Sequence, residues 1–180
     1  MSTHINFVPI NIAIVTISDS RTLENDKSGD VLEERVFKSN HTIISRDIVK
    51  DDFDDIYKLF SNLINNEKID VIISTGGTGL TGRDITPEVM KTLFEKTIDG
   101  FGEMFRWLSY KKIGTSSLQS RALAGVSKGT YIFCLPGSPS ACRDGWDQIL
   151  IHQLDIRHKP CNFVEIMSRL KEHNFSRSKS

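Results

Sequence analysis

The chain has 180 residues, which is long enough for one domain with a full-sized hydrophobic core. Its 23 basic and 23 acidic residues leave no net charge, which excludes a general electrostatic attraction to nucleic acid or to an anionic membrane, so any anion site must be local. Apolar runs such as residues 131–135 fall far short of the roughly 20 residues that a membrane-spanning helix needs, and no signal-peptide pattern opens the sequence. We therefore expect a cytoplasmic protein without nucleic-acid or membrane partners.

The N-terminal part of the chain alternates predicted strands and helices. Residues 1–10 lack periodicity, and we expect an arm that is mobile or lies against a partner. Residues 11–17 form a β-branched apolar run typical of a strand. A helix should follow, capped by Ser28 and with apolar positions at helical spacing as far as Val36. Residues 42–49 predict a second, more polar strand.

The middle of the chain carries the clearest helical pattern. Apolar residues recur every three or four positions from Phe53 to Ile64, and the acidic residues just before and within the first turn favour the positive end of a helix. Residues 71–73 are wholly apolar and β-branched, which predicts a central strand covered by helices on both faces.

The C-terminal part adds further helices and one strand. Amphipathic stretches with helical spacing lie at residues 87–95, 101–108 and 117–125, and another runs from Pro139 to Leu154. Thr86 is expected to cap the first of these helices, with Pro87 at its first position. Residues 131–135 predict a strand after a turn at Lys128 and Gly129.

This alternation predicts the α/β class, as a three-layer α/β/α sandwich with a mostly parallel central sheet. We expect an N-terminal arm at residues 1–10, a single domain at residues 11–170 and a flexible polar tail at residues 171–180. Three cysteines, Cys134, Cys142 and Cys161, are odd in number and lack zinc-site spacing, so we expect reduced thiols packed as small apolar groups.

The strongest candidate site follows the strand at residues 71–73, because open α/β sheets bind ligands beyond the carboxyl ends of their strands. Four glycines within residues 76–82 allow backbone N–H groups to turn toward an anion without an obstructing Cβ. The residues expected to bind phosphate or nucleotide are Gly76, Gly77, Thr78 and Gly79. The alternative is a tight exposed turn whose glycines serve only a positive φ.

Two common phosphate-binding motifs do not fit this loop. Residues 77–82 match G-x-G-x-x-G formally, but the next helix begins only near Pro87 and no strand ending in an acid follows soon after. A Walker A loop ends in Gly-Lys-Ser/Thr, whereas Gly82 is followed by Arg83 and Asp84.

Asp84 is a candidate metal ligand, because a carboxylate beside phosphates is unfavourable unless a cation lies between them. Mg²⁺ is the natural ion, since it combines one or two carboxylates with substrate phosphates. Asp51 follows the second strand and is the second candidate. An alternative stays open for each residue: Asp84 would supply a favourable charge to the helix after it, and Asp51 would cap the helix behind it.

Two other strand ends carry polar residues. Gly137 and Ser138 join a strand to a helix start, a geometry that can bind a further phosphate. Ser18, Asp19 and Arg21 follow the first strand and offer polar contacts to a heterocycle. Each segment can alternatively be a plain turn, and whether residues 22–28 close over a substrate is left open. Residues 101–107 are better interpreted as core or subunit contact than as an aromatic platform for a base.

Several segments together resemble the MoaB/Mog family of molybdenum cofactor biosynthesis proteins. The segments that carry the resemblance are residues 17–22, 26–29, 74–87, 102–106, 113–116, 120–122, 136–139 and 160–163. The resemblance covers about residues 10–170 and implies a three-layer α/β/α fold, homo-oligomers (hexamers in the MoaB branch, trimers in the Mog branch) and molybdopterin as ligand.

In the catalytic branch of this family, the terminal phosphate of molybdopterin attacks the α-phosphorus of ATP in the presence of Mg²⁺. The resemblance implies catalytic and metal-binding roles for Asp84, which matches the family's loop aspartate, and for Asp51, which matches less sharply. It also implies that Ser18, Asp19 and Arg21 bind the pterin. A phosphate nucleophile is already ionised at neutral pH, so the absence of a catalytic triad does not argue against an enzyme. The alternative function is a non-catalytic pterin- or nucleotide-binding scaffold of the same pathway.

Overall fold

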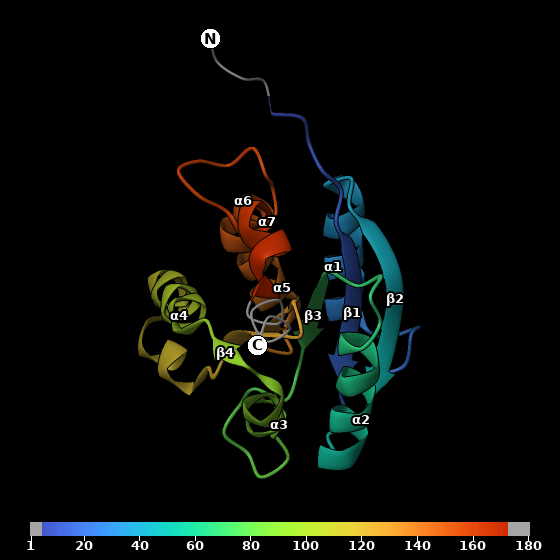
Figure 1. Ribbon diagram of the computed structural model, residues 1–180. Coiled ribbons are helices and arrows are strands. Elements are labelled where there is room, and N and C mark those ends of the chain that lie inside the picture. Colours follow the sequence, from blue (N-terminus) through green and yellow to red (C-terminus); the bar gives the residue numbers. More distant parts are fainter. Residues whose placement is uncertain (1–4, 173–180) are drawn as a thin grey trace.

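A central sheet organises the computed structural model, which describes residues 5–172 (Figure 1). Within that range the strands are β1 (Asn11–Ile17), β2 (Thr42–Val49), β3 (Val71–Thr75), β4 (Lys96–Thr97), β5 (Leu123–Ser127) and β6 (Thr130–Leu135). Their order across the sheet is β2-β1-β3-β6-β5-β4. Strands β2, β1, β3 and β6 are parallel, whereas β5 runs antiparallel to β6 and β4 antiparallel to β5. The sheet is therefore mixed and mostly parallel.

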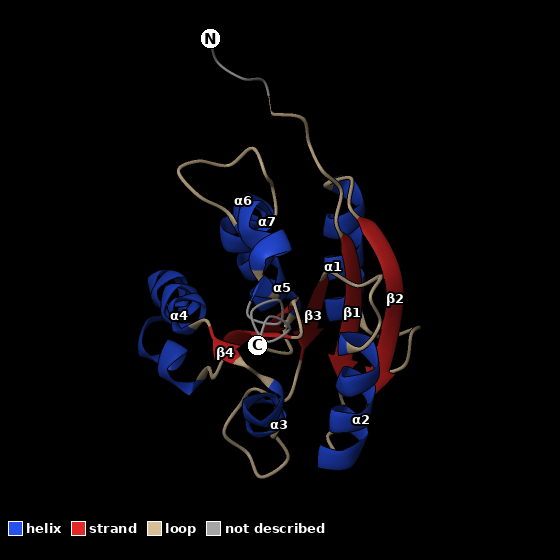
Figure 2. Cartoon of the chain, in the orientation of Figure 1, coloured by secondary structure: helices blue, strands red, loops and turns tan. Residues whose placement is uncertain are grey.

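Helices cover both faces of this sheet (Figure 2). They are α1 (Lys27–Lys38), α2 (Phe53–Ile64), α3 (Thr86–Leu93), α4 (Asp99–Ile113), α5 (Pro139–Gly145), α6 (Ile151–Gln153) and α7 (Phe163–Ile166). A 3₁₀ helix, η1 (Gly114–Gln119), follows α4, a π-helical turn, η2 (Trp146–Leu150), joins α5 to α6, and a 3₁₀ turn, η3 (Met167–Arg169), follows α7.

Two separate hydrophobic clusters define the layers. Alternate residues of β1 point to opposite faces, so Ile12 and Ile14 pack with α1, α4 and α5, whereas Ala13 and Val15 pack with α2 and α3. Because both faces are covered, β1 and β3 need apolar side chains on each face, as their sequences have. This arrangement confirms the predicted three-layer α/β/α sandwich.

Two predicted helix caps are wrong. Helix α1 is capped by Asp26, whose carboxylate accepts the N–H of Gly29 at 3.0 Å, and Ser28 lies inside the first turn. Thr86 lies inside α3, and its hydroxyl donates to the carbonyl of Gly76 at 3.1 Å. In both cases the hydroxyl forms a contact with a distant loop, which local sequence spacing cannot reveal.

The prediction of a helix at residues 117–125 is also wrong. A 3₁₀ helix ends at Gln119, and β5 begins at Leu123. Ala122, Ala124 and Val126 are buried in one cluster while Leu123 packs against the other, which is the alternation of a strand. The short strand β4 pairs with β5 at the edge of the sheet and was not predicted.

Several further expectations meet the structure here. Cys134 and Cys142 are buried free thiols as expected, but Cys161 is exposed. Within residues 5–172, no helix is long and apolar enough to cross a membrane. Of the expected arm, residues 5–10 have no regular secondary structure, and Ile10 is buried in the core. The expected flexible tail lies outside the described residues from position 173 onward.

Candidate functional site

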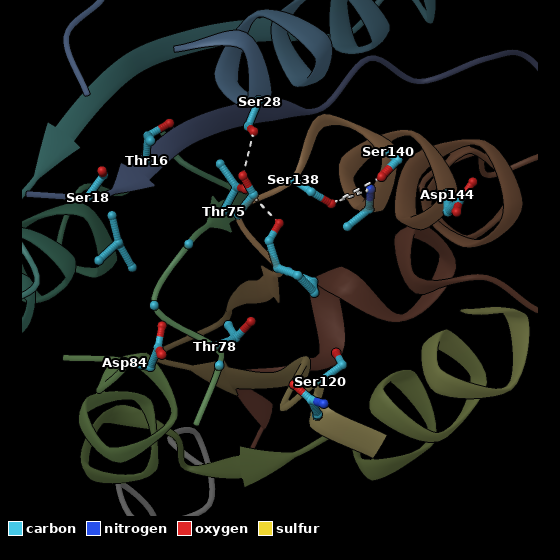
Figure 3. A pocket seen from close by; sticks show the side chains of 18 of the residues that line it. Thr16, Ser18, Ser28, Thr75, Thr78, Asp84, Ser120, Ser138, Ser140 and Asp144 are labelled. Atoms are coloured by element: carbon cyan, nitrogen blue, oxygen red, sulfur yellow. Dashed lines mark hydrogen bonds between the residues drawn. The ribbon is translucent and has the colours of Figure 1, made fainter. Parts of the chain in front are cut away.

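One cavity of about 770 Å³ lies beyond the carboxyl ends of β1, β3 and β6 (Figure 3). The residues predicted for the site that line this cavity are Ser18, Arg21, Gly76, Gly77, Thr78, Gly79, Asp84, Gly137 and Ser138. They come from three loops that are far apart in the sequence. Parallel strands end at the same edge of a sheet, so β1, β3 and β6 bring these loops together.

The loop after β3 at residues 76–82, the glycine loop, is held in a conformation that requires glycine at its start. Gly76 and Gly77 have φ angles of 107° and 62°. A Cβ on Gly76 would lie 2.1 Å from the carbonyl oxygen of Ile17, so the loop passes directly against the end of β1. Thr78 is only 2% exposed. Gly76 and Thr78 are therefore buried, whereas residues 80–83 are exposed, so the solvent-exposed turn describes only the outer part of the loop.

Asp84 lies against the same loop, where its carboxylate is already organised. Its Oδ2 atom accepts hydrogen bonds from the amide and hydroxyl of Thr81 at 2.8 and 2.6 Å. A Cβ on Gly79 would lie 2.7 Å from that oxygen. Burial by itself would raise the pKa of Asp84, but the hydrogen bonds from Thr81 and Gly79 hold it below its ordinary value. The carboxylate is thus ionised and available at neutral pH.

Asp51 does not cap α2, because Asp52 accepts the first N–H groups of that helix. Asp51 stands outside the cavity lining, but its Oδ1 atom lies 2.9 Å from the position of a Cβ on Gly77. Burial, and then the charges of Asp19 and Asp84, raise the pKa of Asp51 above its ordinary value. Two carboxylates that repel each other therefore lie against two glycines of one loop, Asp51 against Gly77 and Asp84 against Gly79.

The residues of the loop after β1 have two different environments, the cavity and a surface ion pair. Ser18 and Arg21 line the cavity, but Asp19 does not. Asp19 instead accepts hydrogen bonds from Arg83 at 2.7 and 3.0 Å and from the amide of Asp51 at 3.2 Å. The hydrogen bond from Arg83 holds the pKa of Asp19 below its ordinary value. Asp19 thus links the loop after β1 to the glycine loop.

The turn after β6 closes the third side of the site. Ser138 caps α5, with its hydroxyl oxygen accepting the amide of Ala141 at 3.1 Å. Gly137 approaches Gly76 so closely that a Cβ would lie 3.3 Å from its Cα atom. The hydroxyl of Ser28 donates to the carbonyl of Gly137 at 2.9 Å, which ties the start of α1 to this turn.

Sequence reasoning missed two parts of the site. Asp26 lines the cavity and is 1% exposed, held by Thr16 at 2.7 Å and Arg46 at 3.1 Å. The opposite wall comes from α4 and η1, where Phe105, Ser109, Lys112, Ile113, Ser116 and Gln119 line the cavity. Asp26 had a usable signal, because it begins one of the segments that carry the family resemblance. Phe105, Ile113 and Ser116 had the same signal, because they lie in the resemblance segments 102–106 and 113–116, but nothing in local spacing placed this wall at the site.

The described part of the chain offers a metal ion carboxylates at this site but no complete set of charged or imidazole ligands. Within the described range, no group of three or more His, Cys, Asp or Glu side chains is arranged to hold a metal ion. Two carboxylates completed by phosphate oxygens are the arrangement that Mg²⁺ commonly adopts.

Comparisons with known proteins place the chain among relatives of one family. Residues 13–156 match the family model described as a probable molybdopterin binding domain. The chain is 46% identical over 157 residues to molybdenum cofactor biosynthesis protein B of Escherichia coli K12, covering 87% of this chain and 92% of that protein. It is 40% identical over 143 residues to a probable molybdopterin adenylyltransferase of Methanocaldococcus jannaschii, covering 74% and 83% of the two chains. A crystal structure of a molybdenum cofactor biosynthesis protein B superposes with a TM-score of 0.82 at 37% identity, covering 92% and 98%.

Proposed function

Since the chain belongs to the molybdenum cofactor biosynthesis protein B (MoaB) family, we propose that it binds molybdopterin in the cavity beyond β1, β3 and β6 and adenylylates its terminal phosphate. The relative from Methanocaldococcus jannaschii bears the name of such an activity. In this reaction an oxygen of the terminal phosphate bonds to the α-phosphorus of ATP. The bond between that phosphorus and the oxygen that bridges the α- and β-phosphates breaks, and pyrophosphate leaves.

The observation that carries the proposal is that the glycine loop and Asp84 line one large cavity together. Phosphoryl chemistry of this kind depends mainly on positioning and on charge neutralisation, because the attacking phosphate is already ionised. Gly76, Gly77, Thr78 and Gly79 would hold phosphates with backbone and hydroxyl groups. The turn at residues 137–138 would hold another phosphate beside them.

Asp51 and Asp84 fit a Mg²⁺ ion. Both lie against the glycine loop, near enough for Asp84 to raise the pKa of Asp51, so a cation between them would relieve their repulsion. Mg²⁺ would supply the neutralisation of phosphate charge that the reaction needs, held by these two carboxylates and by phosphate oxygens.

The loop after β1 would recognise the pterin. Ser18 and Arg21 line the cavity and can present hydroxyl and guanidinium donors to the heterocycle. Asp19 would act through its contacts with Arg83 and the amide of Asp51, which hold this loop in place.

The decisive experiment incubates the purified protein with molybdopterin, ATP and Mg²⁺ and measures adenylylated molybdopterin. We expect product from the wild type, and from Asp84→Asn and Asp51→Asn at least about 100-fold less product, with a smaller loss of pterin binding. Asp52→Asn is the matched control, because asparagine caps α2 as well as aspartate does, and its turnover should stay at the wild-type level. Pterin binding without product from the wild type would establish the non-catalytic scaffold instead.

We also propose that the chain forms homo-oligomers through α4, as hexamers or trimers. Phe101 and Phe105 of α4 are buried in the core, whereas Met104, Trp107 and Tyr110 are half exposed or more on its outer side. Light scattering coupled to size-exclusion chromatography should give an oligomer mass for the wild type and a smaller one for Trp107→Glu. Phe37→Glu on the exposed side of α1 should leave the mass unchanged, and equal masses for all three proteins would reject this interface.

A further inference from the structure

Arg121 is bonded to the backbone of the glycine loop from outside the cavity. Its Nε atom donates to the carbonyl of Gly79 at 2.7 Å, and Nη2 donates to the carbonyl of Asp84 at 2.6 Å. Its own amide donates to the carbonyl of Thr78 at 3.1 Å. Its Nη1 atom pairs with the carboxylate of Glu88 in the first turn of α3. One residue thus binds both ends of the segment from Thr78 to Asp84 and the helix behind it.

These bonds add to others within the loop, where Thr81 donates to the carboxylate of Asp84 and Thr86 donates to the carbonyl of Gly76. Arg121 differs from them in reaching the loop from a distant part of the chain. Ordering a glycine-containing backbone costs more conformational entropy than ordering other residues, so hydrogen bonds to its carbonyl groups help to keep it in one arrangement. The planar fork of arginine can hold two carbonyls and a carboxylate at fixed angles, which lysine cannot do. In a trans peptide the N–H group points away from the C=O group, so holding the carbonyls of Thr78 and Gly79 orients the amides of the next residues.

Arg121 has no direct route to a ligand. Its neighbour Ser120 lines the cavity, in the lower part of Figure 3 with Thr78 and Asp84, but Arg121 does not. Its charge reaches the site through Asp84, whose pKa it helps to lower. Any effect of Arg121 on binding must therefore act through the loop backbone or through the charge of Asp84.

We propose that Arg121 is a positioning residue that preorganises the glycine loop for phosphate. The proposal rests on the proposed function in that the loop is taken to bind phosphate. Its structural part, that Arg121 sets the order of residues 76–85, stands by itself. Loss of the charge-assisted bonds to two carbonyls should loosen the loop and weaken phosphate binding by about 10- to 100-fold.

The first test measures amide hydrogen exchange in the ligand-free full chain. We expect residues 76–85 to exchange about 10- to 100-fold faster in Arg121→Ala and in Arg121→Lys than in the wild type. Arg35→Ala is the matched control, because Arg35 is also largely buried and forks onto Asp147 at 2.8 and 3.0 Å, away from the cavity. It should lower overall stability without speeding exchange in the loop.

The second test titrates each protein with Mg-ATP and repeats the titration with millimolar guanidinium chloride. We expect the Kd to rise about 10- to 100-fold in Arg121→Ala and to recover in part when guanidinium occupies the vacated space. Glu88→Gln should change the Kd little, because Arg121 keeps its bonds to the two carbonyls. A merely structural loss of stability would not be rescued in this way.

The two tests separate the failure of this inference from the failure of the proposed function. If the wild type does not bind Mg-ATP, the proposed function fails, and the exchange rates alone decide the role of Arg121. If the loop exchanges at the wild-type rate in Arg121→Ala, or if Arg35→Ala speeds it equally, Arg121 does not position the loop.

Discussion

Replacing Gly77 by alanine tests whether the site depends on the shape of the glycine loop. Gly77 has a φ of 62°, a left-handed conformation that costs a residue with a Cβ about 1–2 kcal/mol. The new Cβ would lie 2.3 Å from the hydroxyl oxygen of Thr86 and 2.9 Å from a carboxylate oxygen of Asp51. Neither distance can persist, so Thr86 and Asp51 must both move.

The displacement of Thr86 adds to the cost. Thr86 is fully buried, and its hydroxyl donates to the carbonyl of Gly76 at 3.1 Å. Weakening that buried hydrogen bond costs about 1–2 kcal/mol. With the backbone cost included, Gly77→Ala should lower the free energy of unfolding by about 2–4 kcal/mol. It should also weaken Mg-ATP binding, because Asp51 moves.

Gly82→Ala is the control within the same loop. A Cβ there would meet nothing within 4 Å, and the φ of Gly82 is not left-handed. Its free energy of unfolding should stay within about 0.5 kcal/mol of the wild type or rise slightly. Urea unfolding followed by tryptophan fluorescence measures both variants. Equal stabilities for Gly77→Ala and Gly82→Ala would refute the reasoning.

Three further predictions follow from buried or strained groups. Asp51→Asn should raise the urea midpoint at pH 7, because burial and the charges of Asp19 and Asp84 raise the pKa of Asp51 and make its ionised form unfavourable in the fold. Because the pKa of Asp51 is higher in the folded than in the unfolded chain, the wild type loses stability as pH rises through that pKa and Asp51 ionises. Near pH 3 Asp51 is protonated in both states, so the advantage of the variant should vanish there. An advantage that persists at pH 3 contradicts the assignment. His41 is buried, and its Nδ1 atom accepts a backbone N–H at 3.3 Å. Burial lowers the pKa of His41 below 6.5, so the stability of the wild type should fall as pH drops below about 6.5. The stability of His41→Asn should fall less steeply over the same range. Parallel curves for those two proteins would exclude His41 as the cause. Trp146→Ala removes a ring that is 1% exposed and should cost about 3–5 kcal/mol in urea unfolding, and a cost below about 1 kcal/mol would mean that the ring is not part of the core.

Regular elements with a strong local pattern were predictable. The apolar spacing of residues 53–64 and the β-branched runs of residues 11–17 and 71–73 each allow one arrangement that buries their side chains. Residues 117–125 were not predictable in this way. Their few apolar side chains fit a helix and a strand equally, and pairing with β6 decided for the strand.

The lining of the candidate site was predictable where its residues lie at strand ends and in glycine-rich loops. Parallel strands end at the same edge of the sheet, so the loops that follow them line the same cavity. The predicted residues in that lining are Ser18, Arg21, Gly76, Gly77, Thr78, Gly79, Asp84, Gly137 and Ser138. The positions of Asp51 and Asp19 outside the cavity lining were not predictable from spacing. Asp51 and Asp52 are adjacent carboxylates at the start of α2. Asp52 caps the helix, whereas Asp51 lies against Gly77, and local spacing does not show which of the two does which.

By itself the sequence determined the properties that depend on neighbouring residues: which runs with a strong pattern are strands or helices, where glycine permits a tight loop at a strand end, and which family the motifs resemble. The tertiary structure decided the contacts between distant segments. It placed residues of α4 on the opposite wall of the cavity and Arg121 behind the glycine loop. Ser28 and Thr86, which were expected to cap helices, instead donate hydrogen bonds to carbonyls of distant loops. The physical reason is that a hydrogen bond or a cavity wall depends on distance in space, whereas local spacing constrains only residues a few positions apart.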